Sequence, residues 1–142
     1  MSFTGLCWWA VLIGVGFSFV SGGIWFGPKT FYPLWLKSKG VSEPSRENSP
    51  SPIYLFGSTL VAQFVQVLTV GLIVNSIQLH QPNVGIVDGA GIGLALGLGI
   101  SAFSSLPHRL FSMENYKSWI IECANDVLNY IWIAALFAYM NQ

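Results

Sequence analysis

Apolar residues run along this chain in four long blocks, which shorter polar segments separate. The blocks cover about residues 5–26, 53–74, 86–106 and 119–139. Each is close to the 20 residues or so that a helix needs to cross a bilayer core of about 30 Å. The pattern therefore predicts an all-α fold, an integral membrane bundle of four transmembrane helices that forms a single domain over residues 1–142.

The composition favours lipid rather than water as the surroundings of these helices. Hydrophobic residues make up 53% of the chain and charged residues only 8%, whereas a soluble domain carries roughly 25% charged residues. The first block has no basic residue before it and is longer than a signal-peptide core, so we expect it to stay as an anchor. The net charge is zero, which removes the attraction that nucleic-acid binding needs. The expected partner is the lipid bilayer, with no nucleic acid.

The basic residues predict the orientation in the membrane. The first connection ends in a Pro- and Ser-rich stretch, about residues 38–52, which we expect to be a flexible cytosolic loop. Before it, the aromatic and basic stretch Phe31–Lys37 suits a short segment on the cytosolic surface. All Lys and Arg residues fall in the first or third connection: Lys29, Lys37, Lys39, Arg46, Arg109 and Lys117. By the positive-inside bias these connections face the cytosol, and both termini are lumenal or extracellular.

We expect the membrane to be an endomembrane such as the endoplasmic reticulum, with the plasma membrane as the alternative.

The glycine-rich third block indicates how its helix packs. It carries two rows of small residues at four-residue spacing, one of Gly85, Gly89, Gly93 and Gly97 and one of Gly91, Ala95 and Gly99. Glycine costs about 1 kcal/mol relative to alanine inside a helix, and close helix approach compensates for this cost. We expect packing on Gly14, Ser18 and Gly22 of the first block; the alternative is a seam for a homo-oligomer or a membrane partner.

Polar residues in the fourth block carry the candidate chemistry. Glu122, Asn125, Asp126 and Asn129 fall within an arc of about 100° of one helix. An ionised acid at the centre of a span costs roughly 2.5–3.5 kcal/mol, so Glu122 and Asp126 are expected to face the bundle interior. Two acids one turn apart repel each other, and one or both is expected to hold a proton. Such a pair suits general acid–base catalysis, with Asp126 and Glu122 as the catalytic residues.

Other residues are candidates for binding beside these acids. Gln63 and Gln66 lie one turn apart in the second block and are expected hydrogen-bond partners. His108 and Arg109 lie at the end of the third block within reach of Glu122. The predicted substrate-binding set is Asn125, Asn129, Gln63, Gln66, Arg109 and Trp25. The alternative is structural: the polar face holds helices together with hydrogen bonds worth about 0.6–2 kcal/mol each, and Arg109 pairs with Glu122 at the membrane edge.

Three further residues have simpler interpretations. Trp25, at the end of the first block, is expected to anchor the helix at the interface, with a ligand entrance as the alternative. Asp88 begins the third block and suits a helix N-terminus. Cys7 lies in an apolar run, as does Cys123, without a CxxC spacing or a histidine partner, so both are expected to be buried reduced thiols. No metal and no cofactor is expected, since no GxGxxG motif follows a strand.

The run Gly23-Ile24-Trp25-Phe26-Gly27-Pro28, followed by Trp35, resembles the signature of the small membrane proteins grouped as domain of unknown function 1761. The resemblance extends over the whole chain, with four spans, a glycine-rich third span and a polar patch early in the fourth. It implies a compact four-helix membrane protein that can oligomerise, and it implies no reaction.

Two functions from different classes follow from these features. In the first, the multi-pass protein binds and converts a lipophilic small molecule in an intramembrane pocket. It would be a cofactor-independent isomerase or cyclase of secondary metabolism, acting on a terpenoid- or polyketide-like metabolite. In the second, it is a non-catalytic structural or accessory subunit of a membrane complex or pathway. Proton-coupled transport is a third class, for which four spans are few unless the protein oligomerises.

Overall fold

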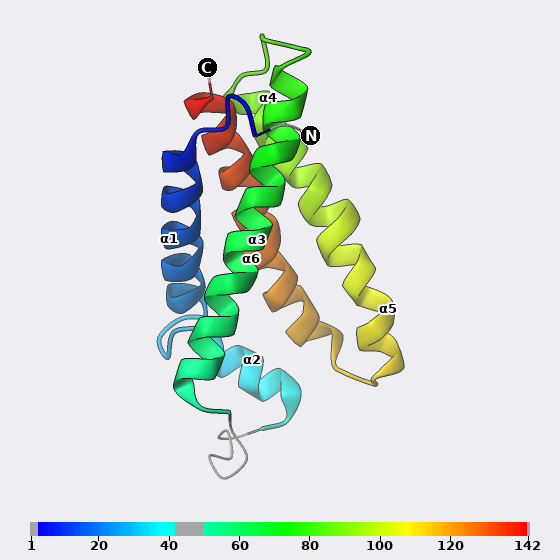
Figure 1. Cartoon of the computed structure of the whole chain (residues 1–142). Helices are drawn as coiled ribbons and strands as arrows, with labels where there is room; N and C mark the ends of the chain where they lie inside the picture. The colour runs from blue at the N-terminus through cyan, green and yellow to red at the C-terminus, as the bar shows by residue number, and fades with distance from the viewer. Residues whose placement is uncertain (1–2, 42–49, 142) are drawn as a thin grey trace.

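The computed structural model describes residues 3–41 and 50–141, which form helices joined by short turns (Figure 1). The helices α4 and α5 continue one another through the π-helical segment η1, so that they form one apolar stretch, Ile86–Phe111. The elements are α1 (Trp8–Trp25), α2 (Tyr32–Lys39), α3 (Pro52–Gln78), α4 (Ile86–Ala95), η1 (Leu96–Ala102), α5 (Phe103–Phe111) and α6 (Tyr116–Met140). Within these described residues, four helices are long and apolar enough to cross a membrane, which confirms the predicted fold class.

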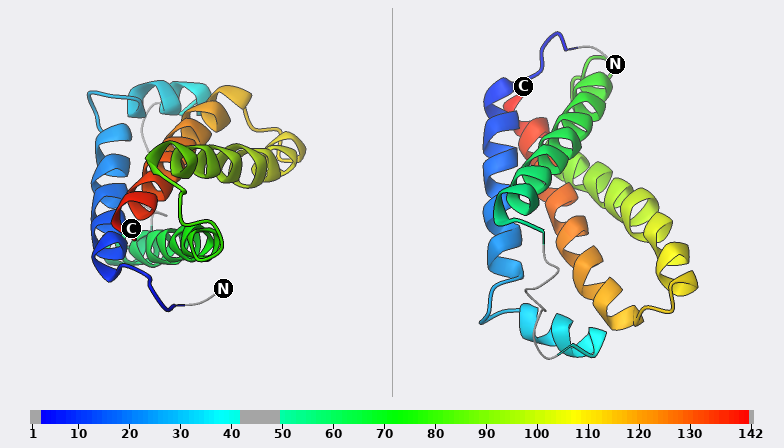
Figure 2. Two further views of the ribbon diagram at one scale, coloured as in Figure 1. Left: turned by 90° about the horizontal axis from the view of Figure 1, so that it is seen from above. Right: turned by 60° about the horizontal axis from the view of Figure 1, so that its bottom comes forward.

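The first connection is more structured than the sequence predicts. Its aromatic and basic stretch forms the helix α2, which has a proline in its first turn and ends at Gly40 in the left-handed conformation, φ 69°. Ser38 and Lys39, assigned above to the flexible loop, belong to this helix. At the other end of that predicted loop Pro52 begins α3, and the loop residues 42–49 lie outside the described residues. Helix α2 lies across one end of the bundle beside the start of α6 (Figures 1 and 2).

The third span continues beyond its predicted end. We expected it to stop near Leu106, because Pro107 follows, but α5 extends to Phe111 with Pro107 inside it. Proline removes its own backbone N–H donor and crowds the carbonyl group of residue i−4, so it can kink a helix without ending it. The last turn of α5 gains a side-chain anchor, since Arg109 bonds to Glu114 and Glu122. The extension therefore brings Arg109 onto a helix rather than a loop.

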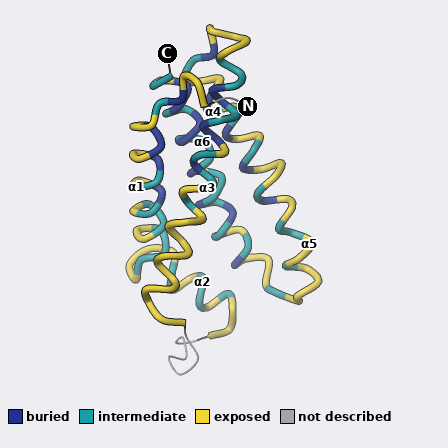
Figure 3. The backbone as a smooth tube through the Cα atoms, in the orientation of Figure 1, coloured by how far each residue is buried: buried dark blue, intermediate teal, exposed yellow. Residues whose placement is uncertain are grey.

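The helices pack tightly at the end of the bundle that carries both termini. Burial is concentrated there (Figure 3). Polar contacts close this end, because Gln78 Nε2 donates to the Ala138 carbonyl at 2.9 Å and the Cys7 N–H donates to Asn141 Oδ1 at 3.0 Å. The core cluster consists of Leu6, Ala10, Val11, Val67, Val70, Val74, Val84, Ile133, Ala134, Phe137 and Ala138.

Toward the opposite end the helices diverge (Figures 1 and 2). Every residue of α3 from 52 to 62 is exposed, although Ile53, Phe56 and Leu60 are large and apolar. Helix α5 has no buried residue. Exposed apolar surface on this scale suits contact with acyl chains. The bundle therefore has one closed end and one open end.

The glycine row of the third span packs on α6, so the predicted packing on α1 is wrong. A Cβ atom on Gly93 would overlap the carbonyl group of Tyr130, and one on Gly89 would lie 2.6 Å from the Ala138 Cβ atom. Ala134 and Ala138 give α6 a small-residue row of its own, which lets the two backbones meet. A connection of only four residues, 112–115, makes the two helices antiparallel neighbours.

The other two rows of small residues, on α1 and on the outer side of the third span, have different neighbours from the row that packs on α6. Gly14 of α1 faces Val67 of α3, and Gly22 has no atom near its Cβ position among the described residues. Gly91, Ala95 and Gly99 are exposed. Their row lies on the surface of this chain, and its role as a seam for a partner stays a prediction.

Substitutions in the two rows test this packing. Gly93→Ala is expected to lower the free energy of unfolding by roughly 1–3 kcal/mol, because the new methyl group must displace the α6 backbone. The matched control, Gly91→Ala, meets open space and is expected to be neutral or to stabilise the helix by up to about 1 kcal/mol. Equilibrium unfolding in mixed detergent micelles measures both. Equal effects of the two substitutions would contradict the assigned packing.

Candidate functional site

Helix α6 carries the candidate site on the half that begins at its N-terminus. The helix begins at Tyr116 because the Asn115 side chain accepts a hydrogen bond from the Lys117 N–H at 3.0 Å. At a rise of 1.5 Å per residue, Glu122 lies about 9 Å and Asp126 about 15 Å along the helix from this start. Glu122 is therefore close to the end of the span and Asp126 is near its middle.

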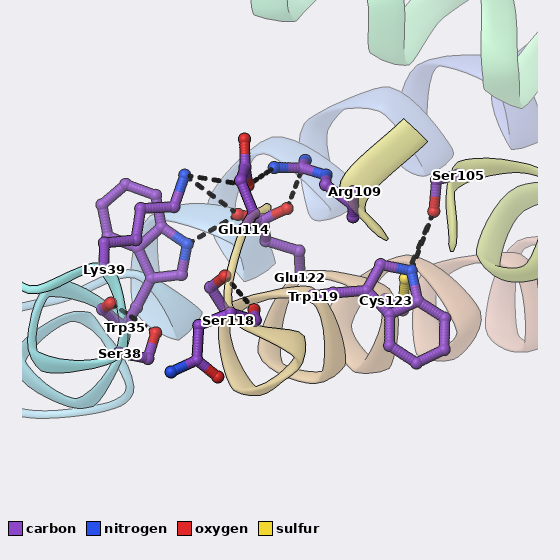
Figure 4. Close-up of polar contacts among 11 residues, drawn as sticks. Trp35, Ser38, Lys39, Ser105, Arg109, Glu114, Ser118, Trp119, Glu122 and Cys123 are labelled. Atoms are coloured by element: carbon purple, nitrogen blue, oxygen red, sulfur yellow. Dashed lines mark hydrogen bonds and ion pairs between the residues drawn. The ribbon is translucent and has the colours of Figure 1, made fainter. Parts of the chain in front are cut away.

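Glu122 belongs to a closed ring of charges that alternate in sign (Figure 4). Arg109 donates at 2.5 Å to both Glu122 and Glu114. The Lys39 ammonium group lies 3.7 Å from Glu122 and 3.8 Å from Glu114. Two cations therefore balance two carboxylates. We name Lys39, Arg109, Glu114 and Glu122 the charge ring.

The charge ring joins three helices at the open end of the bundle. Trp35 of α2 also donates its indole N–H to Glu122 Oε1 at 2.7 Å (Figure 4). The Lys39 ammonium group lies 4.5 Å from the centre of the same indole ring, which adds a cation–π attraction. Glu114 lies in the turn between two spans, and its pKa is below the ordinary value. The main cause is the hydrogen bond that it accepts from Arg109, and the positive charges of Arg109 and Lys39 lower the pKa further. Both carboxylates are thus matched to cations, as the structural alternative for Glu122 requires.

Asp126 has different surroundings from Glu122. Its side chain is partly buried, and within the described residues its carboxylate makes no ion pair and no hydrogen bond. It interacts electrostatically with Glu122 and with the Tyr130 hydroxyl group. That hydroxyl group in turn lies close to the side chains of Gln66 on α3 and Ser101 on η1. Asp126 is therefore a carboxyl group without a cation near the middle of a span, beside neutral polar groups from three elements.

The π-helical segment contributes to these surroundings. Runs of π-helix are rare and often occur at functional sites. Here the segment Leu96–Ala102 passes beside α6, where a Cβ atom on Gly97 would lie 3.0 Å from the Val127 Cα atom and 3.2 Å from the Tyr130 Cβ atom. Ser101 near Tyr130 is part of the same segment. The close approach of η1 thus adds a hydroxyl group beside the polar face of α6.

The amide residues lie mostly inside the bundle. Asn125 and Asn129 are buried, and Asn129 Oδ1 accepts a hydrogen bond from the Trp132 indole at 2.9 Å. The Oε1 atom of Gln63 is buried without a hydrogen-bond partner among the described residues, as is the hydroxyl oxygen of Ser18 on α1. Gln66 is near Tyr130 rather than bonded to an acid. Ser18 on α1 and Gln63 on α3 thus each have a buried oxygen atom that could form a further hydrogen bond.

The two remaining predicted contacts differ. Trp25 donates its indole N–H to the Ile121 carbonyl at 3.0 Å, and its ring lies 4.3 Å from that of Phe31. It therefore ties the end of α1 to α6, and its role toward a ligand stays a prediction. His108 is exposed, whereas its neighbour Arg109 reaches Glu122 as expected. Asp88 accepts a hydrogen bond from the Gly85 N–H at 3.0 Å, which confirms its predicted position at a helix start.

Cys123 lies beside Ser105 of α5, which is hydrogen-bonded to Trp119 of α6. Its sulfur lies 3.7 Å from the Ser105 hydroxyl group, which also accepts a hydrogen bond from the Trp119 indole at 3.0 Å (Figure 4). Both cysteines are free thiols, Cys123 buried and Cys7 partly buried. The described part of the chain has no group of three or more His, Cys, Asp or Glu side chains that could hold a metal ion.

Sequence reasoning missed several residues that surround the two acids. Tyr130 lies four residues after Asp126, so its position on the same helix face was available from the helical period. Trp35 and Lys39 have the same four-residue spacing, but the sequence places Trp35 in a short surface segment and Lys39 in the flexible loop, so the pattern gives no contact with α6. Glu114 and Ser101 gave no signal, because their neighbours depend on how the helices pack.

A double-mutant cycle tests the charge ring. Arg109→Gln and Glu122→Gln are each expected to destabilise the protein, and the double variant by less than their sum, with a coupling of roughly 0.5–1 kcal/mol for a partly exposed ion pair. The matched control combines Glu122→Gln with Lys117→Gln, since Lys117 forms no ion pair among the described residues. Unfolding in detergent measures the four stabilities of each cycle. A coupling no larger than in the control would contradict the ring.

Comparison with known proteins agrees with the family signature described above, which is the run from Gly23 to Pro28 followed by Trp35. No curated protein and no solved structure matches the chain. A family model described as Protein of unknown function (DUF1761) matches residues 9–138, which confirms the resemblance stated above. Since this match covers most of its length, the chain belongs to the DUF1761 family.

Proposed function

We propose that this multi-pass membrane protein binds a lipophilic small molecule beside the polar face of α6 and exchanges a proton with it through Asp126. One observation carries the proposal: Asp126 is a partly buried carboxyl group near the middle of a candidate span, and no cation among the described residues pairs with it. A charged residue at such a depth costs roughly 2.5–3.5 kcal/mol and marks a functional site by default. A ligand is a partner that would justify this cost.

The neighbours of Asp126 support proton transfer to an apolar molecule. Tyr130, Gln66 and Ser101 offer hydroxyl and amide groups that orient an oxygen atom of the ligand. The carboxylic acid would donate its proton to a double bond or carbonyl group, and the resulting carboxylate would take a proton from a neighbouring carbon. The net change is an isomerisation or cyclisation without oxidation. Such a reaction suits a terpenoid- or polyketide-like metabolite and needs no cofactor.

Glu122 has a different role in this proposal. Arg109, Lys39 and Trp35 already engage both of its carboxylate oxygens. A carboxylate held in this way is a weak candidate for proton transfer, because protonation would break two ion pairs. We assign it the positioning of α6 against α2 and α5. Asp126 is then the single proton-carrying residue of the predicted catalytic pair.

Asp126→Asn tests this function, because it keeps the shape of the side chain and removes the titratable proton. Metabolite profiles of cells with and without the gene identify the product. The variant is expected to lower product formation by about 10²–10⁴-fold at unchanged protein abundance. Asp88→Asn is the matched control, an identical change at an exposed helix start. Product formation at the full rate in Asp126→Asn would eliminate the acid–base mechanism.

A non-catalytic role as a structural or accessory subunit is the second candidate. The open end of the bundle favours it, since residues 52–62 of α3 are exposed on every side and the row of Gly91, Ala95 and Gly99 is uncovered by this chain. A membrane partner or a second copy would cover these surfaces. The same variants separate the two roles. If Asp126→Asn leaves the product unchanged and releases a partner in detergent pull-down, the accessory role is correct.

The basic residues support a proposed orientation in the membrane. The described lysines and arginines, Lys29, Lys37, Lys39, Arg109 and Lys117, lie in or beside the turns at the open end, opposite both termini. The positive-inside bias supports a cytosolic open end with the termini lumenal or extracellular. The membrane that we propose is an endomembrane such as the endoplasmic reticulum, with the plasma membrane as the alternative.

Fusion of a compartment-sensitive phosphatase tests this orientation. A phosphatase that is active only outside the cytosol is expected to be active when it follows Gln142. The same enzyme inserted between Glu43 and Glu47 is expected to be inactive there. An inactive fusion after Gln142 together with an active insertion would reverse the topology.

A further inference from the structure

A second site, with both polar and apolar lining residues, lies beside the charge ring on a neighbouring face of α2. It is a pocket of about 440 Å³ between α2 and the start of α6, a volume within the range of small-molecule sites. Three apolar side chains and four polar ones line it: Leu34, Ile120 and Ile121, and Lys37, Ser38, Asn115 and Lys117. The pocket thus combines an apolar wall with two cations.

The helical period explains why these residues face one another. On α2, positions 34, 37 and 38 share one face, while Trp35 and Lys39 share another that contacts Glu122. On α6, positions 117, 120 and 121 repeat the same spacing and face the pocket. The contacts of the charge ring hold α2 in this rotation. Lys37 and Lys117 are thereby brought to one pocket from two helices.

Among the residues that the structure describes, the two pocket lysines have no carboxylate partner. Within the described residues Lys39 and Arg109 are paired with Glu114 and Glu122, whereas Lys37 and Lys117 form no ion pair. Both lysines are exposed, so they can contact a ligand at the membrane surface. The acidic groups closest to Lys117 along the chain, Glu114 and Glu122, are already engaged by cations. A ligand of opposite charge is therefore the missing counterpart.

We infer that this pocket binds an anionic phospholipid, with its phosphate group between Lys37 and Lys117 and the start of an acyl chain against Leu34 and Ile120. Basic residues at the end of a membrane helix attract anionic headgroups by about 1 kcal/mol each. Ser38 and Asn115 add hydrogen-bonding groups at the rim. The apolar wall favours a lipid over a free phosphate ion, because an inorganic ion gains nothing from Leu34 or Ile120. The site is separate from Asp126, so it does not depend on the proposed catalysis.

Lipid retention by the full-length protein tests the site. The protein is reconstituted in nanodiscs of phosphatidylcholine with a minor fraction of phosphatidylglycerol, and native mass spectrometry after release counts the bound lipids. The wild type is expected to retain phosphatidylglycerol in preference to phosphatidylcholine. Each of Lys37→Gln and Lys117→Gln is expected to lower this preference about fivefold, and the double variant about 30-fold, which corresponds to about 1 kcal/mol per charge.

Two controls make the result specific. Lys29→Gln removes an exposed lysine that does not line the pocket and is expected to change the preference by less than about twofold. Ile120→Ser is expected to weaken lipid retention, whereas Leu110→Ser, an equally apolar loss at an exposed position on α5, is not. An equal effect of Lys29→Gln would overturn the pocket in favour of diffuse surface attraction. Displacement of the lipid by inorganic phosphate at millimolar concentration would assign the site to the free ion instead.

Discussion

A carboxylate that leaves water for a bilayer needs a partner, and the two acids of α6 meet this constraint in different ways. Glu122 lies near the end of the span and is matched by Arg109, Lys39 and the Trp35 indole. Asp126 lies one turn deeper, where no cation reaches it among the described residues. The depth of each acid thus decides whether a cation can reach it, because lysine and arginine side chains extend into the membrane only from the ends of the helices, at the membrane surfaces.

The two ends of the bundle differ because different interactions hold them. At the end with the termini, backbones meet along glycine and alanine rows, and Gln78 bonds across the helices. At the open end the helices diverge, and the charge ring replaces close packing as the link among α2, α5 and α6. A few partly exposed ion pairs stabilise less than a packed core does. Asp126 lies between these two regions of the bundle.

The sequence predicts the spans well because the cost of a polar residue in lipid is local and adds along each helix. It does not predict which helices touch. Small-residue rows occur both at Gly14 and Ser18 of α1 and at Ala134 and Ala138 of α6, and the pattern alone favours neither as the partner of Gly93. The site follows the same division: the helical period brings Glu122 and Asp126 to one face, whereas Lys39 reaches Glu122 only because α2 folds back across the end of the bundle.

Helix α2 links the charge ring to the second pocket through the geometry of a single short helix. Glu122 binds the face of α2 that carries Trp35 and Lys39. This contact opposes rotation of α2 about its own axis, and such a rotation would move Lys37 away from Lys117. With eight residues and no buried side chain, α2 has little packing of its own to hold it. Its position therefore depends on a few contacts, those of Glu122 with Trp35 and Lys39 and that of the Trp35 ring with Phe26 at the end of α1. These contacts are consistent with a structural role for Glu122, whereas Asp126 has no ion pair and no hydrogen bond among the described residues.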